Sequence, residues 1–271
     1  MTTNRPVALV TGASSGIGKA AANALVKAGF KVVGTSRDTS RAPSLEGVTF
    51  LDLDVASDSS ASSAVQQVIE RFGRIDVLVN NAGVGSIGAA EESSITQAQA
   101  IFETNVFGVM RMVKEVLPHM RAQGSGRIIN LSSVVGFIPA PYMAVYGASK
   151  HAIEGYSQSL DHEVREYGVR SLLVQPAYTR TGFEANSAAH DTPLPEYAQQ
   201  RETFGGVMAA AIKDGDDPAV VAKVIVAAAT DSKPKLRYTA GPLAGRAGVL
   251  HRLAPARIFD NQIRKMNHLP G

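Results

Sequence analysis

Tyr146 and Lys150 stand four residues apart, in a segment that reads Tyr-Gly-Ala-Ser-Lys. In a helix this spacing puts both side chains on one face. A neighbouring cation favours the phenolate and lowers the pKa of tyrosine from its usual value of about 10. The pair could then exchange a proton with a C–OH or C=O group, and Ser133, thirteen residues earlier, could donate a hydrogen bond to the same oxygen. Because this spacing also arises by chance between a half-buried tyrosine and a surface lysine, the hypothesis depends on the rest of the chain.

A glycine-rich turn lies near the start of the chain. Apolar runs over residues 6–11 and 31–35 predict two strands, and the helical pattern between them ends at Gly29. In such a β–α–β unit, glycines let the backbone approach a pyrophosphate, whose charge meets the N-terminus of the helix. The turn reads Thr-Gly-x-x-x-Gly-x-Gly, and its expected dinucleotide-binding residues are Gly12, Ser14, Ser15, Gly16, Ile17 and Gly18. A purely structural turn is the alternative.

The end of the second predicted strand should select the cofactor. An acidic residue there binds the ribose 2′-OH of NAD, whereas an arginine accommodates the 2′-phosphate of NADP. Arg37 can fork onto a phosphate, and Ser36 or Thr35 can hydrogen-bond to it. Asp38 could instead face a ribose, or form a surface pair with Arg37. We therefore predict NADP(H), bound by Ser36 and Arg37, with NAD(H) as the less favoured cofactor.

Polar residues also follow the third and fourth predicted strands, residues 48–55 and 75–79. Asp54 could reach an adenine ring or cap the next helix. The Asn-Asn-Ala-Gly segment over residues 80–83 bends the chain at the carboxyl edge of the sheet, where ligands of open α/β sheets bind. The cofactor-binding residues expected here are Asp54, Val55, Asn81, Ala82 and Gly83.

The chain continues with the same alternation of strands and helices. A long helix over about residues 94–120 carries Asn105 within its apolar stripe, as a core asparagine or as a catalytic or water-holding residue. A loop over residues 134–145 precedes the helix of Tyr146. Further strands are predicted over residues 126–133, 169–176 and 236–240. The pattern predicts an α/β fold of one doubly wound domain, residues 1–271, whose single parallel sheet of about seven strands has helices on both faces (a Rossmann fold).

Two segments have weaker signals. Residues 182–217 are rich in small and polar residues with little periodicity, which predicts a lid over the substrate. Residues 241–271 predict a C-terminal helical extension in which basic and apolar residues are mixed. A packed terminal helix and a membrane-surface or partner-binding helix both fit that composition, and the packed helix is the simpler interpretation.

Composition excludes several classes of protein. Of 271 residues, 45% are apolar and 19% charged, which is typical of a globular chain. The net charge of +3, without a basic run in the first 230 residues, does not indicate a nucleic-acid partner. The absence of cysteine excludes disulfides and thiolate catalysis and suits a reducing compartment. With no apolar signal segment and no run near the ~20 residues of a membrane span, we expect a cytoplasmic enzyme without stable membrane insertion, and we assign no metal site.

Taken in order, these motifs resemble the short-chain dehydrogenase/reductase (SDR) family, from Val10 to about Thr181. The resemblance implies a catalytic set of Asn105, Ser133, Tyr146 and Lys150. Ser133 is chosen over Ser132 because the family's serine lies thirteen residues before its tyrosine. The implied activity is hydride transfer between NADP(H) and a carbonyl or secondary alcohol, as in a carbonyl reductase.

The resemblance also implies a role for each residue of the set. The tyrosine exchanges a proton with the substrate oxygen, the lysine lowers the pKa of the tyrosine and holds the nicotinamide ribose, the serine steadies the substrate oxygen, and the asparagine holds a water. Further cofactor contacts are implied for Tyr146, Lys150, Pro176, Thr179 and Thr181. The chain departs from the family pattern at Ala177, where Pro-Gly is common, and alanine allows fewer backbone conformations than glycine.

The C-terminal part is similar to hydroxysteroid-dehydrogenase-like members, which implies a bulky, apolar alcohol or ketone. Residues that could line an apolar pocket, or simply pack in the core, are Tyr142, Met143, Tyr178, Phe183, Phe204 and Met208. The family implies a homodimer or homotetramer formed through the helices that carry Asn105 and Tyr146. Two alternatives to a carbonyl reductase use the same cofactor fold. One is a nucleotide-sugar epimerase or dehydratase, which usually has a larger substrate domain, and the other is a non-catalytic NADP-binding sensor.

Overall fold

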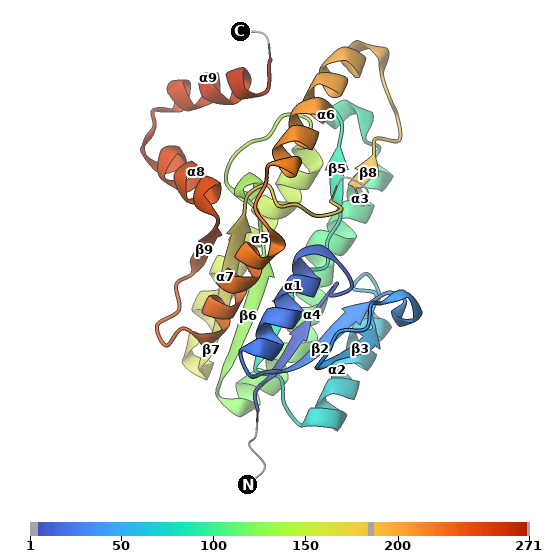
Figure 1. Ribbon diagram of the computed structural model, residues 1–271, viewed down its shortest axis with the longest axis vertical. Helices are drawn as coiled ribbons and strands as arrows, with labels where there is room; N and C mark the ends of the chain where they lie inside the picture. The colour runs from blue at the N-terminus through green and yellow to red at the C-terminus, as the bar shows by residue number, and fades with distance from the viewer. Residues whose placement is uncertain (1–4, 184–186, 270–271) are drawn as a thin grey trace.

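A parallel sheet of seven strands forms the centre of the computed structural model, which describes residues 5–183 and 187–269 (Figure 1). The strand order is β3-β2-β1-β4-β6-β7-β9. The strands are β1 (Val7–Val10), β2 (Lys31–Ser36), β3 (Val48–Asp52), β4 (Val77–Asn80), β6 (Gly126–Leu131), β7 (Val169–Pro176) and β9 (Arg237–Ala240). The predicted Rossmann architecture is confirmed, because the order reverses direction from β1 to β4 as in a doubly wound sheet.

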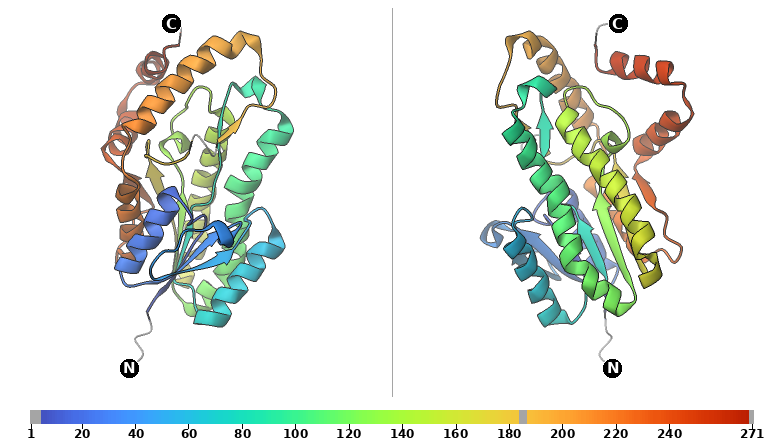
Figure 2. Two further views of the ribbon diagram at one scale, coloured as in Figure 1. Left: turned by 45° about the vertical axis from the view of Figure 1, so that its right-hand side comes forward. Right: turned by 180° about the vertical axis from the view of Figure 1, so that it is seen from behind.

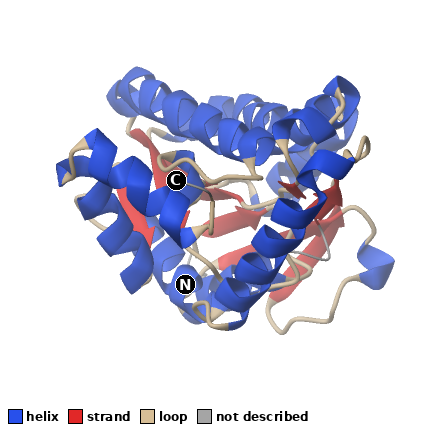
Figure 3. Cartoon of the chain, turned by 90° about the horizontal axis from the view of Figure 1, so that it is seen from above, coloured by secondary structure: helices blue, strands red, loops and turns tan. Residues whose placement is uncertain are grey.

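Helices cover both faces of this sheet (Figures 2 and 3). Alternate residues of β1 enter different cores, with Val7 and Leu9 on the side of α2, α4 and α5 and Ala8 and Val10 on the side of α1 and α7. A strand buried on both faces reads as a continuous apolar run, which is what the sequence has. The helices are α1 (Gly16–Lys27), α2 (Asp58–Phe72), α3 (Ile95–Phe102), α4 (Gly108–Gln123), α5 (Ala144–Val164), α6 (Ala198–Lys213), α7 (Pro218–Thr230), α8 (Pro242–Leu253) and α9 (Ala256–Met266).

The helix expected over residues 94–120 is interrupted. Between α3 and α4, Glu103–Phe107 forms a π-helical turn, which a pattern of apolar spacing does not reveal. Asn105 lies in this turn and is buried. Single π-helical turns inside helices are often found beside functional sites. The expected loop over residues 134–145 likewise contains a 3₁₀ turn, Val134–Gly136, before α5 begins at Ala144.

A small second sheet joins two segments far apart in the chain. β5 (Gly85–Ile87) and β8 (Ser187–Ala189) pair in parallel, outside the main sheet. Neither strand was predicted, because each is only three residues long. The pairing brings the start of the expected lid segment beside the chain that leaves β4, and α6 follows it along the top of the molecule (Figure 1).

The C-terminal helices α8 and α9 follow β9 and lie at the periphery of the molecule (Figures 1 and 2). Their backbone agrees with the predicted helical character of this segment. In residues 5–183 and 187–269, no helix has both the length and the apolar composition that crossing a membrane requires.

Candidate active site

The glycine-rich turn between β1 and α1 leaves a stretch of bare backbone at the start of α1. Gly12 and Gly16 have φ angles of +65° and +52°, in the left-handed region that favours glycine. A Cβ atom at Gly18 would lie 2.2 Å from the carbonyl oxygen of Gly12 and 2.4 Å from Nδ2 of Asn81. Side chains at these positions would strain or displace the turn. The turn leads into the N-terminus of α1, where backbone N–H groups can receive a phosphate. The turn therefore fits the pyrophosphate of a dinucleotide.

The Asn-Asn-Ala-Gly segment after β4 is fastened to this turn. The hydroxyl of Thr11 accepts hydrogen bonds from the N–H groups of Asn81 (3.0 Å) and Ala82 (2.9 Å). In return, Nδ2 of Asn81 donates to the carbonyl oxygens of Thr11 (2.9 Å) and Gly12 (3.0 Å). These bonds hold the ends of two neighbouring strands together, so that Asn81, Ala82 and Gly83 line the same cleft as the glycine turn.

Arg37 and Asp38, at the end of β2, have different surroundings. Arg37 is exposed, lines the cleft, and forms no hydrogen bond or ion pair with the described residues. The carboxylate of Asp38 accepts hydrogen bonds from the N–H and hydroxyl of Ser40 at 3.0 and 2.6 Å and pairs with Arg41 at 3.2 Å. The surface pair between Arg37 and Asp38 is not formed. The hydroxyl of Ser36, also in the cleft wall, donates to the carbonyl oxygen of Asp38 at 3.3 Å.

Asp54 lies in the cleft wall just beyond β3. Its carboxylate accepts a hydrogen bond from the N–H of Ala56 at 3.0 Å, and its own N–H donates to the hydroxyl of Ser60 at 3.0 Å. The cap of α2 is Ser57, whose hydroxyl accepts from the N–H of Ser60 at 3.3 Å. Helix capping by Asp54 is therefore wrong, and both Asp54 and Val55 line the cleft.

These strand ends border a cleft of about 430 Å³ at the carboxyl edge of the sheet. The predicted residues on its wall are Gly12, Ser14, Ser15, Gly16, Ile17, Ser36, Arg37, Asp54, Val55, Asn81, Ala82, Gly83, Ser133, Tyr146, Lys150, Pro176, Thr179 and Thr181. Two predicted residues are not part of the wall. Gly18 packs beneath the glycine turn, and Asn105 lies behind the segment that follows β4.

Tyr146 and Lys150 share one face of α5, as their spacing predicts, and each is 8% exposed. The hydroxyl of Tyr146 shares a hydrogen bond with the hydroxyl of Ser133. Ser133 also donates to the carbonyl oxygen of Pro176 at 3.5 Å. The Nζ atom of Lys150 donates to the carbonyl oxygen of Leu131 at 2.8 Å and lies 5.6 Å from the centroid of the Tyr146 ring. The three side chains thus meet at one point of the cleft.

Burial changes the proton affinities of this group. Burial raises the pKa of Tyr146 above its ordinary value, and the hydrogen bond with Ser133 opposes this rise only in part. Burial lowers the pKa of Lys150 to about 8, and the carboxylate of Glu154 acts in the opposite direction. Contrary to the expectation from its spacing to Lys150, the pKa of Tyr146 is not lowered, because loss of solvent around the buried phenol favours its neutral form. Tyr146 is therefore protonated near neutral pH and carries the proton that an acid needs.

Asn105 connects two walls of the cleft from behind. Its Oδ1 atom accepts from the N–H of Val84 at 2.8 Å, and its Nδ2 atom donates to the carbonyl oxygen of Val84 at 2.8 Å and to the hydroxyl of Ser149 at 3.1 Å. That hydroxyl donates in turn to the carbonyl oxygen of Tyr146 at 2.7 Å. The amide is therefore satisfied by the protein, as in a core asparagine, and its catalytic role stays a prediction.

The loop after β7 forms the opposite wall. Pro176, Ala177, Thr179 and Thr181 all line the cleft. Ala177 does not have a positive φ angle, so alanine fits at the position where the family commonly has glycine. The hydroxyl of Thr179 donates to the carbonyl oxygen of Ala177 at 3.1 Å. The methyl group of Thr181 packs against Gly16 of the glycine turn, where a Cβ would lie 3.3 Å away.

The part of the cleft near Tyr146 is apolar. Four of the predicted pocket residues line it, namely Met143, Tyr178, Phe183 and Met208. The ring of Phe183 meets that of Tyr146 edge to face, with 5.4 Å between centroids. Tyr142 and Phe204, stacked at 5.6 Å, belong to the same apolar cluster but lie behind the wall. The wall of the cleft beside the phenol is therefore largely apolar.

Sequence reasoning missed several residues of the site. Val84 and Gly85 line the cleft directly after the predicted Asn-Asn-Ala-Gly segment, so extending that segment would have found them. Thr104 lines it from the π-helical turn, for which the sequence carries no signal. Glu154 is 5% exposed and follows Lys150 by four residues, a helical spacing that could have revealed it.

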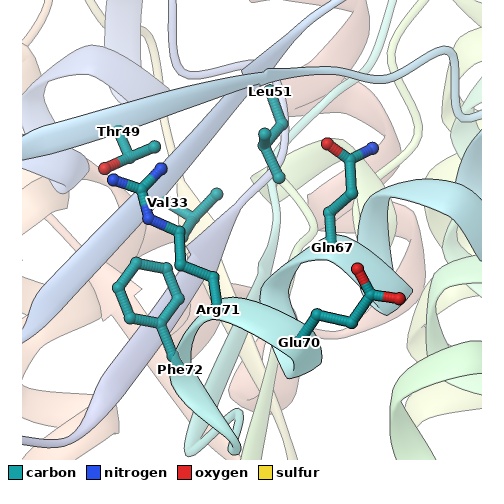
Figure 4. A pocket seen from close by; sticks show the side chains of 7 residues that line it. All are labelled: Val33, Thr49, Leu51, Gln67, Glu70, Arg71 and Phe72. Carbon is teal, nitrogen blue, oxygen red and sulfur yellow. The ribbon is translucent and has the colours of Figure 1, made fainter.

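A second hollow, of about 310 Å³, lies between α2 and the strands β2 and β3 (Figure 4). Its walls are formed by Val33, Thr49, Leu51, Gln67, Glu70, Arg71 and Phe72. None of these residues lines the main cleft or belongs to the predicted site. The hollow is a surface feature beside the edge of the sheet.

Comparisons with known proteins agree with this geometry. The model of the short chain dehydrogenase family matches residues 6–192 of the chain. 3-ketodihydrosphingosine reductase of Bacteroides thetaiotaomicron is 38% identical over 244 residues, which cover 88% of each chain. Retinol dehydrogenase 8 of Bos taurus is 35% identical over 259 residues, which cover 84% of this chain and 79% of the relative.

Solved structures resemble most or nearly all of the chain. A short-chain dehydrogenase from Streptomyces avermitilis superposes with a TM-score of 0.85 and 33% identity, and the match covers 99% of both chains. A short chain dehydrogenase/reductase from Burkholderia phymatum in complex with NAD has a TM-score of 0.78 and 27% identity over 92% of this chain and 93% of its own. ElxO with NADP bound has a TM-score of 0.72 and 28% identity over 89% of this chain and 99% of its own. Both nicotinamide dinucleotides thus occur among the structural neighbours.

Proposed function

The chain belongs to the short-chain dehydrogenase family of oxidoreductases, and we propose that it is an NADP(H)-dependent enzyme that reduces the carbonyl group of an apolar substrate. Members of this family bind a nicotinamide cofactor. The glycine turn, with its bare backbone and two left-handed glycines, fits the pyrophosphate of such a cofactor. The choice of NADP(H), the direction of the reaction and the class of substrate are the parts that we propose.

The observation that carries the choice of NADP(H) is the state of Arg37. Arg37 lines the cleft, and its guanidinium has no partner among the described residues, whereas Asp38 is bonded to Ser40 and Arg41. A guanidinium can bind a 2′-phosphate through two parallel hydrogen bonds, and Ser36 lines the same cleft. A carboxylate that receives the ribose 2′-OH of NAD should line the cleft, and Asp38 is not part of the cleft wall.

The proposed mechanism assigns one task to each buried group. When bound, the cofactor supplies the hydride that reduces the carbonyl carbon. Tyr146, which is protonated near neutral pH and lines the cleft beside Ser133, gives its phenolic proton to the carbonyl oxygen. Ser133, which is hydrogen-bonded to Tyr146, steadies that oxygen, and Lys150 holds a positive charge next to the phenol. Asn105 braces the helix of Tyr146 through Ser149.

The proposed substrate is an apolar ketone, or the corresponding secondary alcohol in the reverse direction. Met143, Tyr178, Phe183 and Met208 form the wall next to Tyr146 and offer few polar groups to a substrate. The names of two relatives, a 3-ketodihydrosphingosine reductase and a retinol dehydrogenase, also refer to large apolar molecules. A bulky apolar substrate would remove this wall from water, which favours binding in proportion to the area buried.

A binding titration tests the choice of cofactor. The protein is titrated with NADPH and with NADH, and the fluorescence of the reduced nicotinamide reports binding. We expect NADPH to bind at least about tenfold more tightly than NADH, because a charged hydrogen bond contributes roughly 1.5–3 kcal/mol. Arg37→Ala should remove this preference, and Arg41→Ala, which changes an exposed arginine paired with Asp38, should keep it. An equal or tighter affinity for NADH in the wild type would overturn the proposal.

None of the relatives named above is an epimerase, a dehydratase or a sensor. We therefore do not carry those functions further. Assembly into a homodimer or homotetramer through α4 and α5 remains a prediction, supported by the exposure of Phe107 (46%) just before α4. The cytoplasmic location also remains a prediction from the sequence.

A further inference from the structure

The helices α8 and α9 concentrate the exposed apolar side chains of the molecule. Nine large apolar residues are exposed in the part of the chain that the structure describes, and six of them lie in these two helices. We name these six the C-terminal apolar surface: Leu243, Val249, Leu250, Leu253, Ile258 and Met266. Scattered single apolar residues are normal on a protein surface, but a gathering of this kind marks a place where something binds.

In α8 the apolar residues share the face that is turned away from the protein. Ala244 is fully buried and faces the interior. Leu243 and Leu250 are two helical turns apart, and Val249 and Leu253 are one turn apart, so all four lie on the side opposite to Ala244. Leu253 is 74% exposed. A helix that serves only to cover the core would show the reverse arrangement.

In α9 the apolar stripe is only half covered. The ring of His251, from α8, contacts Phe259 edge to face at 5.3 Å. Phe259 and Ile263 are therefore partly buried, while Ile258 and Met266 on the same side of the helix are both 59% exposed. The helix thus packs against its neighbour with one edge of its apolar stripe and leaves the other edge open to solvent.

Basic residues accompany this surface. The two helices carry five lysines and arginines and a single acidic residue, Asp260. Four of the basic residues are exposed and have no ion-pair partner among the described residues, namely Arg246, Arg252, Arg257 and Lys265. Lysine and arginine can lay their aliphatic stems along an apolar surface and reach anionic groups with their charged ends.

We propose that α8 and α9 bind the surface of an anionic lipid bilayer, with the C-terminal apolar surface entering the headgroup layer. An amphipathic helix with apolar and basic residues lies in the plane of such an interface, held by apolar burial and by attraction to anionic lipids. A second copy of the chain fits less well, because two copies of this surface would bring like charges together. The chain would rest on the bilayer without crossing it.

The proposed membrane surface is next to the cleft. His251 of α8 contacts the ring of Phe137 at 5.9 Å, and Phe137 follows the 3₁₀ turn whose Val134 and Val135 line the cleft. Docking of α8 and α9 would therefore hold this border of the cleft close to the lipid. That such docking brings an apolar substrate to Tyr146 rests on the proposed function, whereas the binding itself does not.

Flotation with vesicles tests the proposal without cofactor or substrate. The full chain is mixed with vesicles of phosphatidylcholine, or of phosphatidylcholine with phosphatidylglycerol, and centrifuged through a density gradient. We expect the protein to float with the anionic vesicles and to be released in part by salt. Leu250→Ser with Leu253→Ser should lower the vesicle–water partition coefficient at least about tenfold. The matched control is Ile95→Ser in α3, since Ile95 is 75% exposed and Leu253 is 74% exposed.

Charge variants and hydrogen exchange complete the test. Arg252→Gln with Arg257→Gln should weaken binding to anionic vesicles, while Lys27→Gln with Lys114→Gln, which removes two exposed charges elsewhere, should not. In the wild type, vesicles should slow amide exchange within residues 242–266, a result that does not depend on the folding of any variant. Absence of wild-type flotation would overturn the proposal. A second result would also overturn it: the wild type forms an oligomer, Leu253→Ser dissociates that oligomer, and neither the wild type nor the variant floats. In that case a second copy of the chain would cover the surface.

Discussion

Glu154 lies one helical turn after Lys150 on the buried side of α5. Its carboxylate is bound by side chains from two strands of the sheet, β7 and β9. It accepts hydrogen bonds from Nε2 of Gln175 at 2.8 Å and from Nε of Arg237 at 3.1 Å. Burial lowers the pKa of Lys150 to about 8, and Glu154 opposes that fall. Glu154 is therefore a positioning residue that helps to keep the ammonium group charged beside Tyr146.

This relationship predicts the pH dependence of Glu154→Gln. If reduction requires the charged form of Lys150, kcat/KM falls as the pH rises through its pKa of about 8. Loss of the carboxylate lowers that pKa further, so the alkaline limb should move to lower pH, and at pH 8 kcat/KM should drop roughly fivefold. The measurement is a pH profile of kcat/KM with saturating NADPH. Glu163→Gln, an exposed change on the same helix, is the control, and an unmoved limb in Glu154→Gln would contradict the assigned role.

Gly18→Ala should weaken cofactor binding while the protein stays folded. The new Cβ would lie 2.2 Å from the carbonyl oxygen of Gly12 and 2.4 Å from Nδ2 of Asn81, so the turn and its brace must move. We expect the dissociation constant for NADPH to rise at least about tenfold, equal to about 1.4 kcal/mol. Fluorescence titration measures it.

Gly155→Ala is the matched control for that substitution. Gly155 lies in α5, and a Cβ atom added there would meet open space, with no neighbouring side chain within 4 Å. The substitution should leave NADPH affinity unchanged and raise the free energy of unfolding by about 0.5–1 kcal/mol, since alanine is the better helix former. Equal NADPH affinity in both variants would show that the glycine turn does not receive the cofactor.

Glu92→Gln should loosen the segment that leads into α6. Burial alone would raise the pKa of Glu92, but the N–H groups of Leu194 and Ala89 and the guanidinium of Arg201 hold it below its usual value. Glutamine cannot replace all of these charged bonds, so the free energy of unfolding should fall by about 2 kcal/mol. Amide exchange around Leu194 should quicken, as mass spectrometry can measure.

The lowered pKa of Glu92 also predicts that the stability of the protein depends on pH. Because the folded pKa of Glu92 lies below its unfolded value, its contribution to stability is present above the unfolded pKa, near 4.5, and is lost as the pH falls through the folded pKa. Glu91→Gln, an exposed neighbour bonded to Tyr197 at 3.0 Å, is the control. If both variants exchange like the wild type, Glu92 does not anchor this segment.

Strand ends were the most predictable part of the site. In a parallel sheet, the carboxyl ends of neighbouring strands meet at one edge, so the residues after β1, β2, β3, β4 and β6 could be assigned to one cleft from their order alone. The helical spacing of Tyr146 and Lys150 was equally reliable, because a helix fixes which side chains share a face.

Features that depend on contacts between distant segments could not be predicted. The π-helical turn at Asn105 is accompanied by hydrogen bonds to Val84, twenty-one residues away. The sign of the pKa change at Tyr146 depends on how much water the surrounding fold removes, which no local pattern contains. The sequence allowed Asp54 either to reach the adenine ring or to cap α2. Only the structure distinguishes the two, because the cap of α2 is Ser57.

The central claim is that Tyr146 gives a proton to a carbonyl group during reduction by NADPH. The most direct measurement is the rate of NADPH consumption with a series of apolar ketones, for the wild type and for Tyr146→Phe, with NADPH affinity determined for both. We predict turnover by the wild type and a loss of at least about 100-fold in kcat for Tyr146→Phe, with its affinity for NADPH within about twofold of the wild type. Equal turnover by the two proteins would contradict the account.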